Sequence, residues 1–169
     1  IGTLAKTGEA KEWQVNIISG DKDLLPLVSN QVKVSLTRKG ISEVDTYTPD
    51  FLLEKMEIRP DQVIDMKALM GDSSDNIPGV PGVGQKTAVK LLKQFDTLEN
   101  LYDHVDEVSG KKLKEKLTTH KESAFMSKTL ATIQSDSPLE VGLDEISYQG
   151  YDAKAVSTIF KELGFQSLL

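Results

Sequence analysis

Residues 71–92 combine two kinds of chemistry in one short segment, and this segment most limits what the chain can fold into. Asp72 and Asp75 lie three residues apart among small polar residues, and paired carboxylates suit hard cations such as Mg²⁺. Glycines and prolines follow, and then a stretch whose apolar period predicts a helix. A helix that opens from a glycine turn presents free backbone N–H groups to an anion. Metal ligands beside a phosphate-binding turn are typical of enzymes that act on phosphodiesters.

Two known motifs compete for the glycine turn of this segment. A nucleotide-binding P-loop needs Lys and Ser/Thr directly after its last glycine, whereas here Gln85 separates Gly84 from Lys86. This spacing excludes an ATPase or GTPase of that kind. Residues 81–88 instead fit the hairpin of a helix-hairpin-helix, in which small Ala88 lets two helices pack closely. An ordinary loop before a helix is the alternative, and lysines at helical spacing favour contact with a DNA backbone.

A second pair of acids, Asp21 and Asp23, follows an apolar run in residues 13–20 that predicts a buried parallel strand. In open α/β sheets, ligands collect at the carboxyl ends of the strands. Two acids on a tight turn can therefore point toward one cation. The alternative is that one of them caps a helix at residues 24–28, and the spacing alone favours this role. If the turn lies beside Asp72 and Asp75, four carboxylates meet and require cations.

The other segments predict a small α/β part followed by helices. Residues 1–12 fit the end of a helix, and residues 31–47 alternate as a hairpin or as paired edge strands around a turn at residues 38–40. Met66 and Met70 are expected in the core, and Leu130 is expected to face inward. The predicted helices cover residues 48–58, 60–70, 98–105, 121–133 and 151–163, with a basic amphipathic segment at 109–117 that is either a solvated face or a duplex contact.

The composition narrows the functional classes. The chain has 169 residues, no cysteine and a net charge of −6. Without cysteine there is no disulfide and no thiolate zinc site, which fits a reducing cytoplasm. No apolar run approaches the length of a membrane span, and no signal peptide opens the sequence. The acidic balance argues against nonspecific DNA binding by the whole surface, but backbone amides and a few lysines suffice for phosphate contacts.

With these motifs in view, the sequence resembles the 5′-nuclease superfamily, and within it the 5′→3′ exonuclease domain of bacterial DNA polymerase I. The resemblance covers essentially the whole chain and is most specific at residues 19–23 and 71–88. It implies an α/β fold with part of a PIN-like, parallel-sheet nuclease core in residues 1–47. A mostly helical helix-hairpin-helix region follows in residues 48–169, with the hairpin at about residues 71–93.

The resemblance also implies an activity. Relatives are metal-dependent 5′→3′ exonucleases and 5′-flap endonucleases that act on DNA and on RNA primers in replication and repair. Two divalent ions, Mg²⁺ or Mn²⁺, would activate a water and stabilise the leaving oxygen. The matching ligands, mainly for one ion, are Asp21, Asp23, Asp72 and Asp75. The other acidic ligands of the family precede the residue that matches Ile1, so we expect this chain alone to be nearly inactive.

The same resemblance implies that the hairpin holds the unbroken strand of a duplex. Its matching DNA-binding residues are Gly82, Val83, Gly84, Gln85, Lys86 and Thr87. Relatives also carry a K⁺ ion on backbone carbonyls of the hairpin, here those of Gly79, Val80 and Val83. The implied context is a bacterial cytoplasm, with a polymerase domain further along the same full-length chain and no membrane partner.

Two other hypotheses remain open. One is a non-catalytic DNA-binding module that uses only the hairpin, and it is distinguished by metal binding, since such a module has no use for four clustered acids. The other is a free-standing bacterial 5′-nuclease, which sequence beyond Leu169 decides. In either case, the strand at residues 15–18 is expected to leave an open sheet edge that is prone to pair with another chain.

Overall fold

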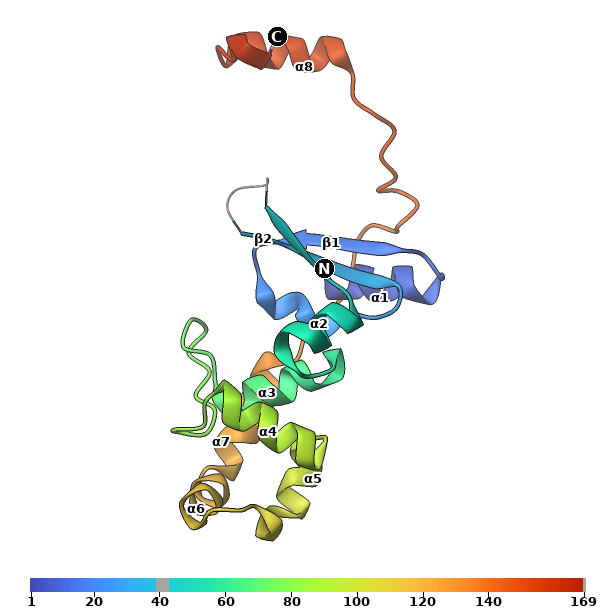
Figure 1. Cartoon of the computed structure of the whole chain (residues 1–169). Helices are drawn as coiled ribbons and strands as arrows, with labels where there is room; N and C mark the ends of the chain where they lie inside the picture. The colour runs from blue at the N-terminus through green and yellow to red at the C-terminus, as the bar shows by residue number, and fades with distance from the viewer. Residues whose placement is uncertain (39–42, 169) are drawn as a thin grey trace. The chain divides into compact units, whose positions relative to one another are not determined.

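The computed structural model describes residues 1–38 and 43–168 (Figure 1). The chain forms two compact units, Ile1–Ser137 and Pro138–Leu169. The predicted boundary at Tyr47 lies within the first unit, where the sheet ends and the helices begin, and that division stays a prediction. Among the described residues, no helix has the length and apolar character needed to cross a bilayer.

The first unit contains a three-stranded sheet in the order β1-β2-β3. β1 (Val15–Ser19) pairs in parallel with β2 (Val32–Thr37), and β2 pairs antiparallel with β3 (Val44–Tyr47). These pairings confirm the predicted parallel strand and the predicted strand pair in residues 31–47. The turn predicted at residues 38–40 lies largely outside the described residues. The preceding helix α1 (Gly2–Ala10) packs against β1, where Gly8 lies close to the Val15 side chain.

The prediction that β1 is a buried strand is wrong for one of its faces. Ile17 points into the core and is 8% exposed, whereas Ile18 on the opposite face is 70% exposed. Successive residues of a strand face opposite sides of the sheet. A short apolar run therefore cannot show by itself that both faces are covered.

The helices of the first unit follow the predicted order. They are α2 (Pro49–Met56), α3 (Val63–Met70), α4 (Gln85–Phe95), α5 (Leu98–Asp103), α6 (Lys111–Thr119) and α7 (Lys121–Ala131). Short 3-10 turns lie between some of these helices, with η2 (Pro60–Gln62) after α2 and η3 (Val105–Glu107) after α5. A further 3-10 turn, η1 (Lys22–Leu27), joins β1 to β2. Local signals explain where α2 begins. The Thr48 hydroxyl accepts the Phe51 N–H at 3.3 Å, and Pro49 occupies the first turn of the helix.

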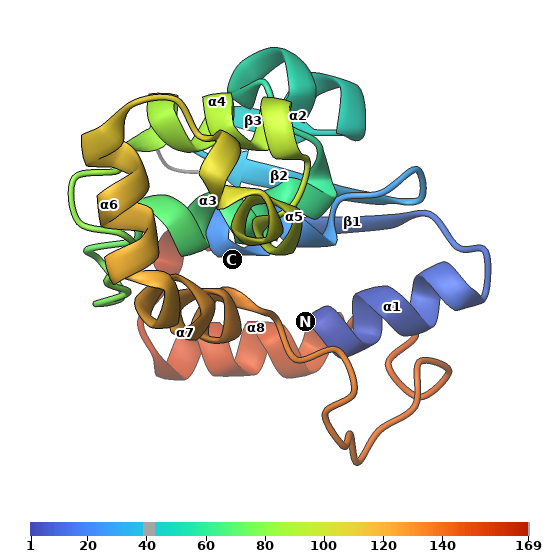
Figure 2. The ribbon, with the colours of Figure 1, turned by 90° about the horizontal axis from the view of Figure 1, so that it is seen from below.

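Helix α3 lies between α4 and α7 in the helical part of the first unit (Figure 2). Its Met66 is buried, as predicted, and Ala88 of α4 is fully buried and allows close helix packing. Leu130 of α7 does not face inward as predicted and is 58% exposed. The inward face of α7 instead follows Ala124 and Ser127, because Ser127 bonds the backbone of the hairpin segment.

The second unit is small. Its helix α8 (Ala153–Glu162) begins at Asp152, whose side chain accepts the Lys154 and Ala155 N–H groups, and a 3-10 turn, η4 (Gln166–Leu168), follows. The rings of Phe160 and Phe165 lie 6.0 Å apart, so the end of the chain folds back on α8. This confirms the predicted closing helix.

Tyr102 is buried where α5 meets α6 and α7. Its hydroxyl donates to the Leu117 carbonyl at 3.2 Å, and its ring lies 5.3 Å from that of Phe125. Burial raises the pKa of Tyr102 from its ordinary value of 10.0 to about 12. A group whose pKa is higher in the folded chain than in the unfolded chain stabilises the fold fully at pH values below its unfolded-state pKa. The free energy of unfolding should therefore fall as the pH rises from about 10 to about 12.

Absorbance of tyrosinate in the near ultraviolet checks this expectation during an alkaline titration. Tyr102→Phe should remove the signal that appears last and the matching alkaline loss of stability. Tyr148→Phe, at an exposed position of the second unit, should leave both in place. A late signal that survives Tyr102→Phe would show that another group titrates there.

Candidate functional site

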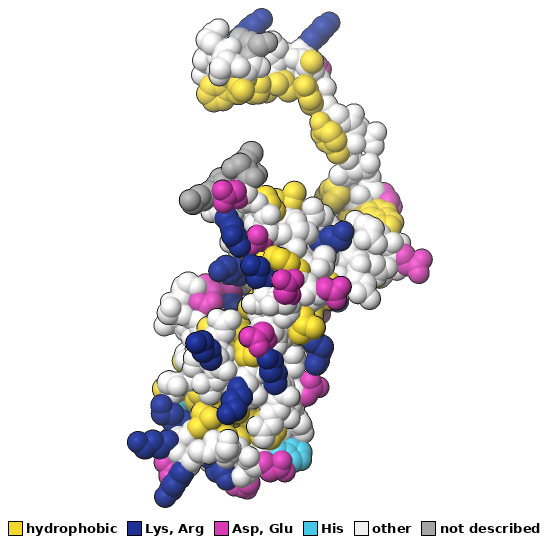
Figure 3. All heavy atoms as spheres, in the orientation of Figure 1, with side chains coloured by type: hydrophobic (Ala, Val, Ile, Leu, Met, Phe, Trp, Pro, Cys, Tyr) yellow, Lys and Arg dark blue, Asp and Glu magenta, His cyan; other side chains and the backbone are white. Residues whose placement is uncertain are grey.

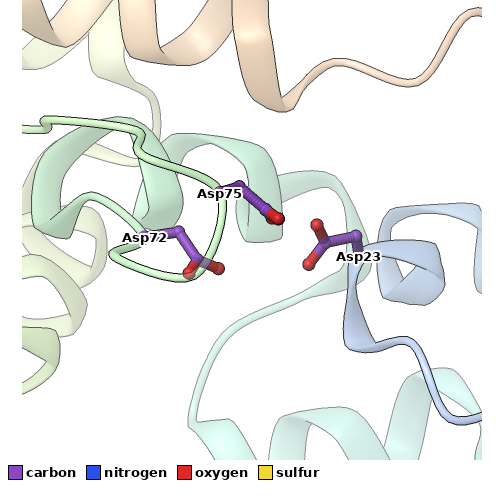
Figure 4. Close-up of side chains that lie close together, drawn as sticks. All are labelled: Asp23, Asp72 and Asp75. Atoms are coloured by element: carbon purple, nitrogen blue, oxygen red, sulfur yellow. The ribbon is translucent and has the colours of Figure 1, made fainter.

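Three of the four predicted acids converge in the first unit. Carboxylate oxygens of Asp23, Asp72 and Asp75 all lie within 4.8 Å of one another. Figure 4 shows Asp23 pointing from the start of η1 toward Asp72 and Asp75, which come from the loop after α3. We call these three residues the carboxylate cluster. The fold thus brings the end of β1 beside the segment that the sequence analysis singled out.

The loop that carries Asp72 is folded by its own backbone. Gly71 ends α3 with a φ of 72°, a conformation that glycine adopts without strain. Asp72 and Ile77 then exchange two backbone hydrogen bonds, of 2.9 Å and 2.8 Å. Within this loop, the Asp72 carboxylate accepts the Ser74 N–H at 3.0 Å. The positions of Asp72 and Asp75 therefore depend on a tight turn of local sequence.

Asp21 adopts the capping role that the sequence analysis left open. Its carboxylate accepts the Asp23 N–H at 2.8 Å and so opens η1. It also lines a surface hollow of about 360 Å³ together with the carboxylate cluster. Its predicted role as a metal ligand stays a prediction.

Lys67 of α3 is the residue of this site that the sequence analysis missed. It is buried to 9% exposure, and its Nζ forms ion pairs with Asp23 and, at 3.0 Å, with Asp72. A lysine within a mostly apolar helix was the available signal, because buried lysines need partners. One lysine against three carboxylates leaves two negative charges on the site.

The pKa shifts follow from these contacts. Hydrogen bonds from Ser74 and then from Lys67 lower the pKa of Asp72 to about 2. The pKa of Asp75 is raised, because Asp75 shares a hydrogen bond with Asp23 and faces its charge. Burial opposes the charge on Lys67, but its bonds to the two acids outweigh burial and raise its pKa. The carboxylates of the cluster repel one another, and their oxygens are hard donors. Such a group fits a divalent cation such as Mg²⁺ or Mn²⁺.

Helix α7 holds the segment between the carboxylate cluster and the hairpin. The Gly79 N–H donates to the buried Ser127 hydroxyl at 2.9 Å, and the Gly79 carbonyl accepts the Ser123 hydroxyl at 2.8 Å. The Val80 carbonyl accepts the Val83 N–H at 3.0 Å. Two of the three carbonyls predicted to bind K⁺ therefore already accept hydrogen bonds, and the K⁺ site stays a prediction.

The hairpin presents its backbone rather than apolar side chains. Gly82 and Gly84 are exposed, whereas Val83 between them is buried. A Cβ atom at Gly84 would meet nothing within 4 Å, so a ligand has room there. Gln85 and Lys86 are exposed in the first turn of α4, and Thr87 is half-buried. The predicted residues other than Val83 reach the surface, and DNA binding by all six stays a prediction.

Helix α6 contributes to this surface through Lys116. Its Nζ lies so close to Gly82 that a Cβ atom there would collide with it. The basic segment at residues 109–117 thus reaches the hairpin, although its sequence pattern is equally typical of a solvated face.

Comparison with known proteins then identifies the family. The family model described as 5′-3′ exonuclease, C-terminal SAM fold, matches residues 58–154, more than half of the chain. The chain belongs to the 5′-3′ exonuclease family. This confirms the resemblance seen in residues 71–88, which lie within the matched range.

Curated relatives of this 5′-3′ exonuclease chain are much longer than the chain itself. DNA polymerase I of Bacillus subtilis (strain 168) is 58% identical over 169 residues, which are 100% of this chain and 19% of that protein. DNA polymerase I of Bacillus caldotenax is 54% identical, with the same two coverages. The chain thus spans about a fifth of the length of these relatives.

Solved structures share the fold of this family member at low sequence identity. T5 5′-exonuclease with bound zinc matches with a TM-score of 0.66 at 23% identity, over 77% of this chain and 48% of that one. The catalytic core of Rad2 with a DNA substrate matches with a TM-score of 0.58 at 16% identity, over 95% of this chain and 56% of that one. Together with the mixed sheet and the helices, these matches confirm the predicted α/β, PIN-like nuclease fold.

Proposed function

We propose that this chain supplies one part of the nuclease centre and the duplex-binding hairpin of a metal-dependent 5′→3′ exonuclease and 5′-flap endonuclease. The observation that carries the proposal is the convergence of Asp23, Asp72 and Asp75 within 4.8 Å, in the unit that also presents the hairpin. The names of the relatives support a place within a bacterial DNA polymerase I, with a polymerase region in the same longer protein and a cytoplasmic location. The zinc in T5 5′-exonuclease and the DNA in Rad2 support a divalent cation and a DNA substrate.

In this proposal, the chain's own residues prepare the centre. The carboxylate cluster would hold the cation, and Asp21 lies at the edge of the same hollow. Lys67 draws Asp23 and Asp72 together through its two ion pairs, so it fixes two of the donors before a cation arrives. The bound cation would activate a water and stabilise charge on the phosphodiester. The exposed backbone of Gly82 and Gly84 would hold a phosphate of the duplex, with Lys86 and Lys116 beside it.

Calorimetric titration with Mn²⁺ tests the proposed centre. We expect the wild-type chain to bind Mn²⁺ and Asp72→Asn/Asp75→Asn to bind it at least about tenfold more weakly, since even outer partners of ligands contribute about 10–100-fold to metal affinity. Asp103→Asn/Glu107→Gln makes the same change in charge at exposed positions of α5 and η3 and should bind like wild type. Equal binding by both double variants would remove the cluster as the cation site. No binding by wild type would leave the hairpin as the proposed function of this chain.

A further inference from the structure

Three surface hollows of the first unit adjoin one another between the carboxylate cluster and α4. The acidic hollow, of about 360 Å³, shares Lys22, Asp23 and Asp72 with a second hollow of about 330 Å³. The second hollow, which we call the methionine pocket, shares Lys55, Met56 and Gln85 with a third hollow of about 520 Å³ between α2 and α4. We call the third hollow the lysine groove. The three hollows are therefore neighbours, and the second has lining residues in common with each of the other two.

The walls of the methionine pocket are mostly apolar and its ends are polar. Side chains from η1, β3, α2 and α3 form the apolar walls, namely Leu25, Tyr47, Met56, Val63, Met66 and Met70. Lysines stand at both ends, with Gln85 at the end that opens into the lysine groove. Methionine side chains are flexible and polarizable, so they adapt to ligands of different shapes and contact aromatic rings favourably. Such a site suits a planar group with apolar faces and polar edges, which is the chemistry of a nucleobase.

The lysine groove offers positive charge at helical spacing. Lys86, Lys90 and Lys93 lie on one side of α4, and Lys55 of α2 lies opposite them. Lys55 is held over the Phe51 ring at 5.5 Å, and Lys93 pairs with Glu57. Within the part of the chain that the structure describes, Lys86 and Lys90 have no acidic partner. Lysine and arginine side chains recur over the helical part of one face in Figure 3.

We propose that the methionine pocket accepts one unpaired nucleobase of a nucleic-acid strand whose phosphates lie along the lysine groove. The nucleotide in the pocket then lies next to Asp23 and Asp72, which line the same hollow. This inference rests on the proposed function and adds a subsite for an unpaired nucleotide to it. An acidic peptide fits the lysines equally well, but a nucleic-acid strand joins a planar base to each phosphate and so matches the methionine pocket and the lysine groove together.

The experiment uses a flap oligonucleotide that carries the fluorescent base 2-aminopurine at its first unpaired position, with a chelator present so that no cleavage occurs. Anisotropy gives the affinity at several salt concentrations, and 2-aminopurine emission reports the surroundings of the base. Lys55→Gln/Lys90→Gln should make the slope of log affinity against log salt shallower by about 1.4, since each lost contact with a single strand contributes about 0.7. Lys6→Gln/Lys33→Gln, exposed positions of α1 and β2, should leave the slope unchanged.

Met56→Trp tests the pocket separately, because Met56 is half-buried and lines the pocket where it meets the groove. It should abolish the change in 2-aminopurine emission while the salt slope stays that of wild type. If wild type binds the oligonucleotide but neither variant differs from it, the subsite is wrong and the proposed function stands. If wild type binds an acidic peptide and not the oligonucleotide, the subsite and the nucleic-acid function both fail.

Discussion

Gly79→Ala is expected to lower the free energy of unfolding by at least about 2 kcal/mol, since a non-glycine residue forced into this backbone conformation costs about 1–3 kcal/mol and a steric clash adds to it. Gly79 has a φ of 60°. A Cβ atom there would collide with the Gly71 nitrogen and lie 2.7 Å from the Gly71 Cα. These are backbone atoms at the end of α3, so they cannot move aside as a flexible side chain does. Denaturant unfolding followed by circular dichroism measures the loss.

The matched control is Gly84→Ala, five residues further along the same segment. Gly84 has a φ of −98°, and an added Cβ atom meets nothing within 4 Å. Its cost should stay at or below about 1 kcal/mol, because Ala is a poorer residue than Gly at the start of a helix. Equal losses in both variants would contradict the close packing of Gly71 and Gly79. Gly79→Ala should also weaken Mn²⁺ binding, because the loop of Asp72 and Asp75 begins at Gly71.

Asp65→Ala is expected to destabilise the first unit by about 3 kcal/mol, the order found when one partner of a buried ion pair is removed. Asp65 of α3 is 4% exposed, accepts the Leu98 N–H at the start of α5 at 2.9 Å, and pairs with Lys128 of α7 at 2.7 Å. One carboxylate thus ties three helices together. Its removal leaves a buried N–H and a half-buried ammonium without this partner. Denaturant unfolding again gives the measurement.

Glu99→Gln serves as the control for Asp65→Ala. Glu99 is exposed and accepts the same Lys128 ammonium at 2.7 Å, so its loss should cost less than about 1 kcal/mol. Asp65→Ala/Lys128→Met should recover part of the loss, because it removes the ammonium that the single change leaves unpaired. If the double variant is no more stable than Asp65→Ala, the cost arises at the Leu98 N–H and not at the buried charge.

The elements of this chain could be predicted from sequence because their signals are local. Thr48 with Pro49 starts α2, Gly71 ends α3, and Gly84 precedes α4, each through groups a few residues apart. The Asp72 turn is equally local, since its hydrogen bonds join residues 72–77. The faces of these elements were harder to predict. Ile18 and Leu130 are exposed because burial depends on which neighbours pack against a strand or helix, and apolar character alone does not show this.

The sequence by itself determined the segments that carry acids and glycines and the family to which the chain belongs. The tertiary structure alone decided which of these groups meet. Lys67 reaches Asp23 across 44 residues, and Ser127 bonds Gly79 across 48. Such pairs form because helices and strands pack in one arrangement, and no local propensity specifies a partner that far along the chain. The carboxylate cluster and its lysine are therefore properties of the packed fold, built from turns that short-range chemistry had already shaped.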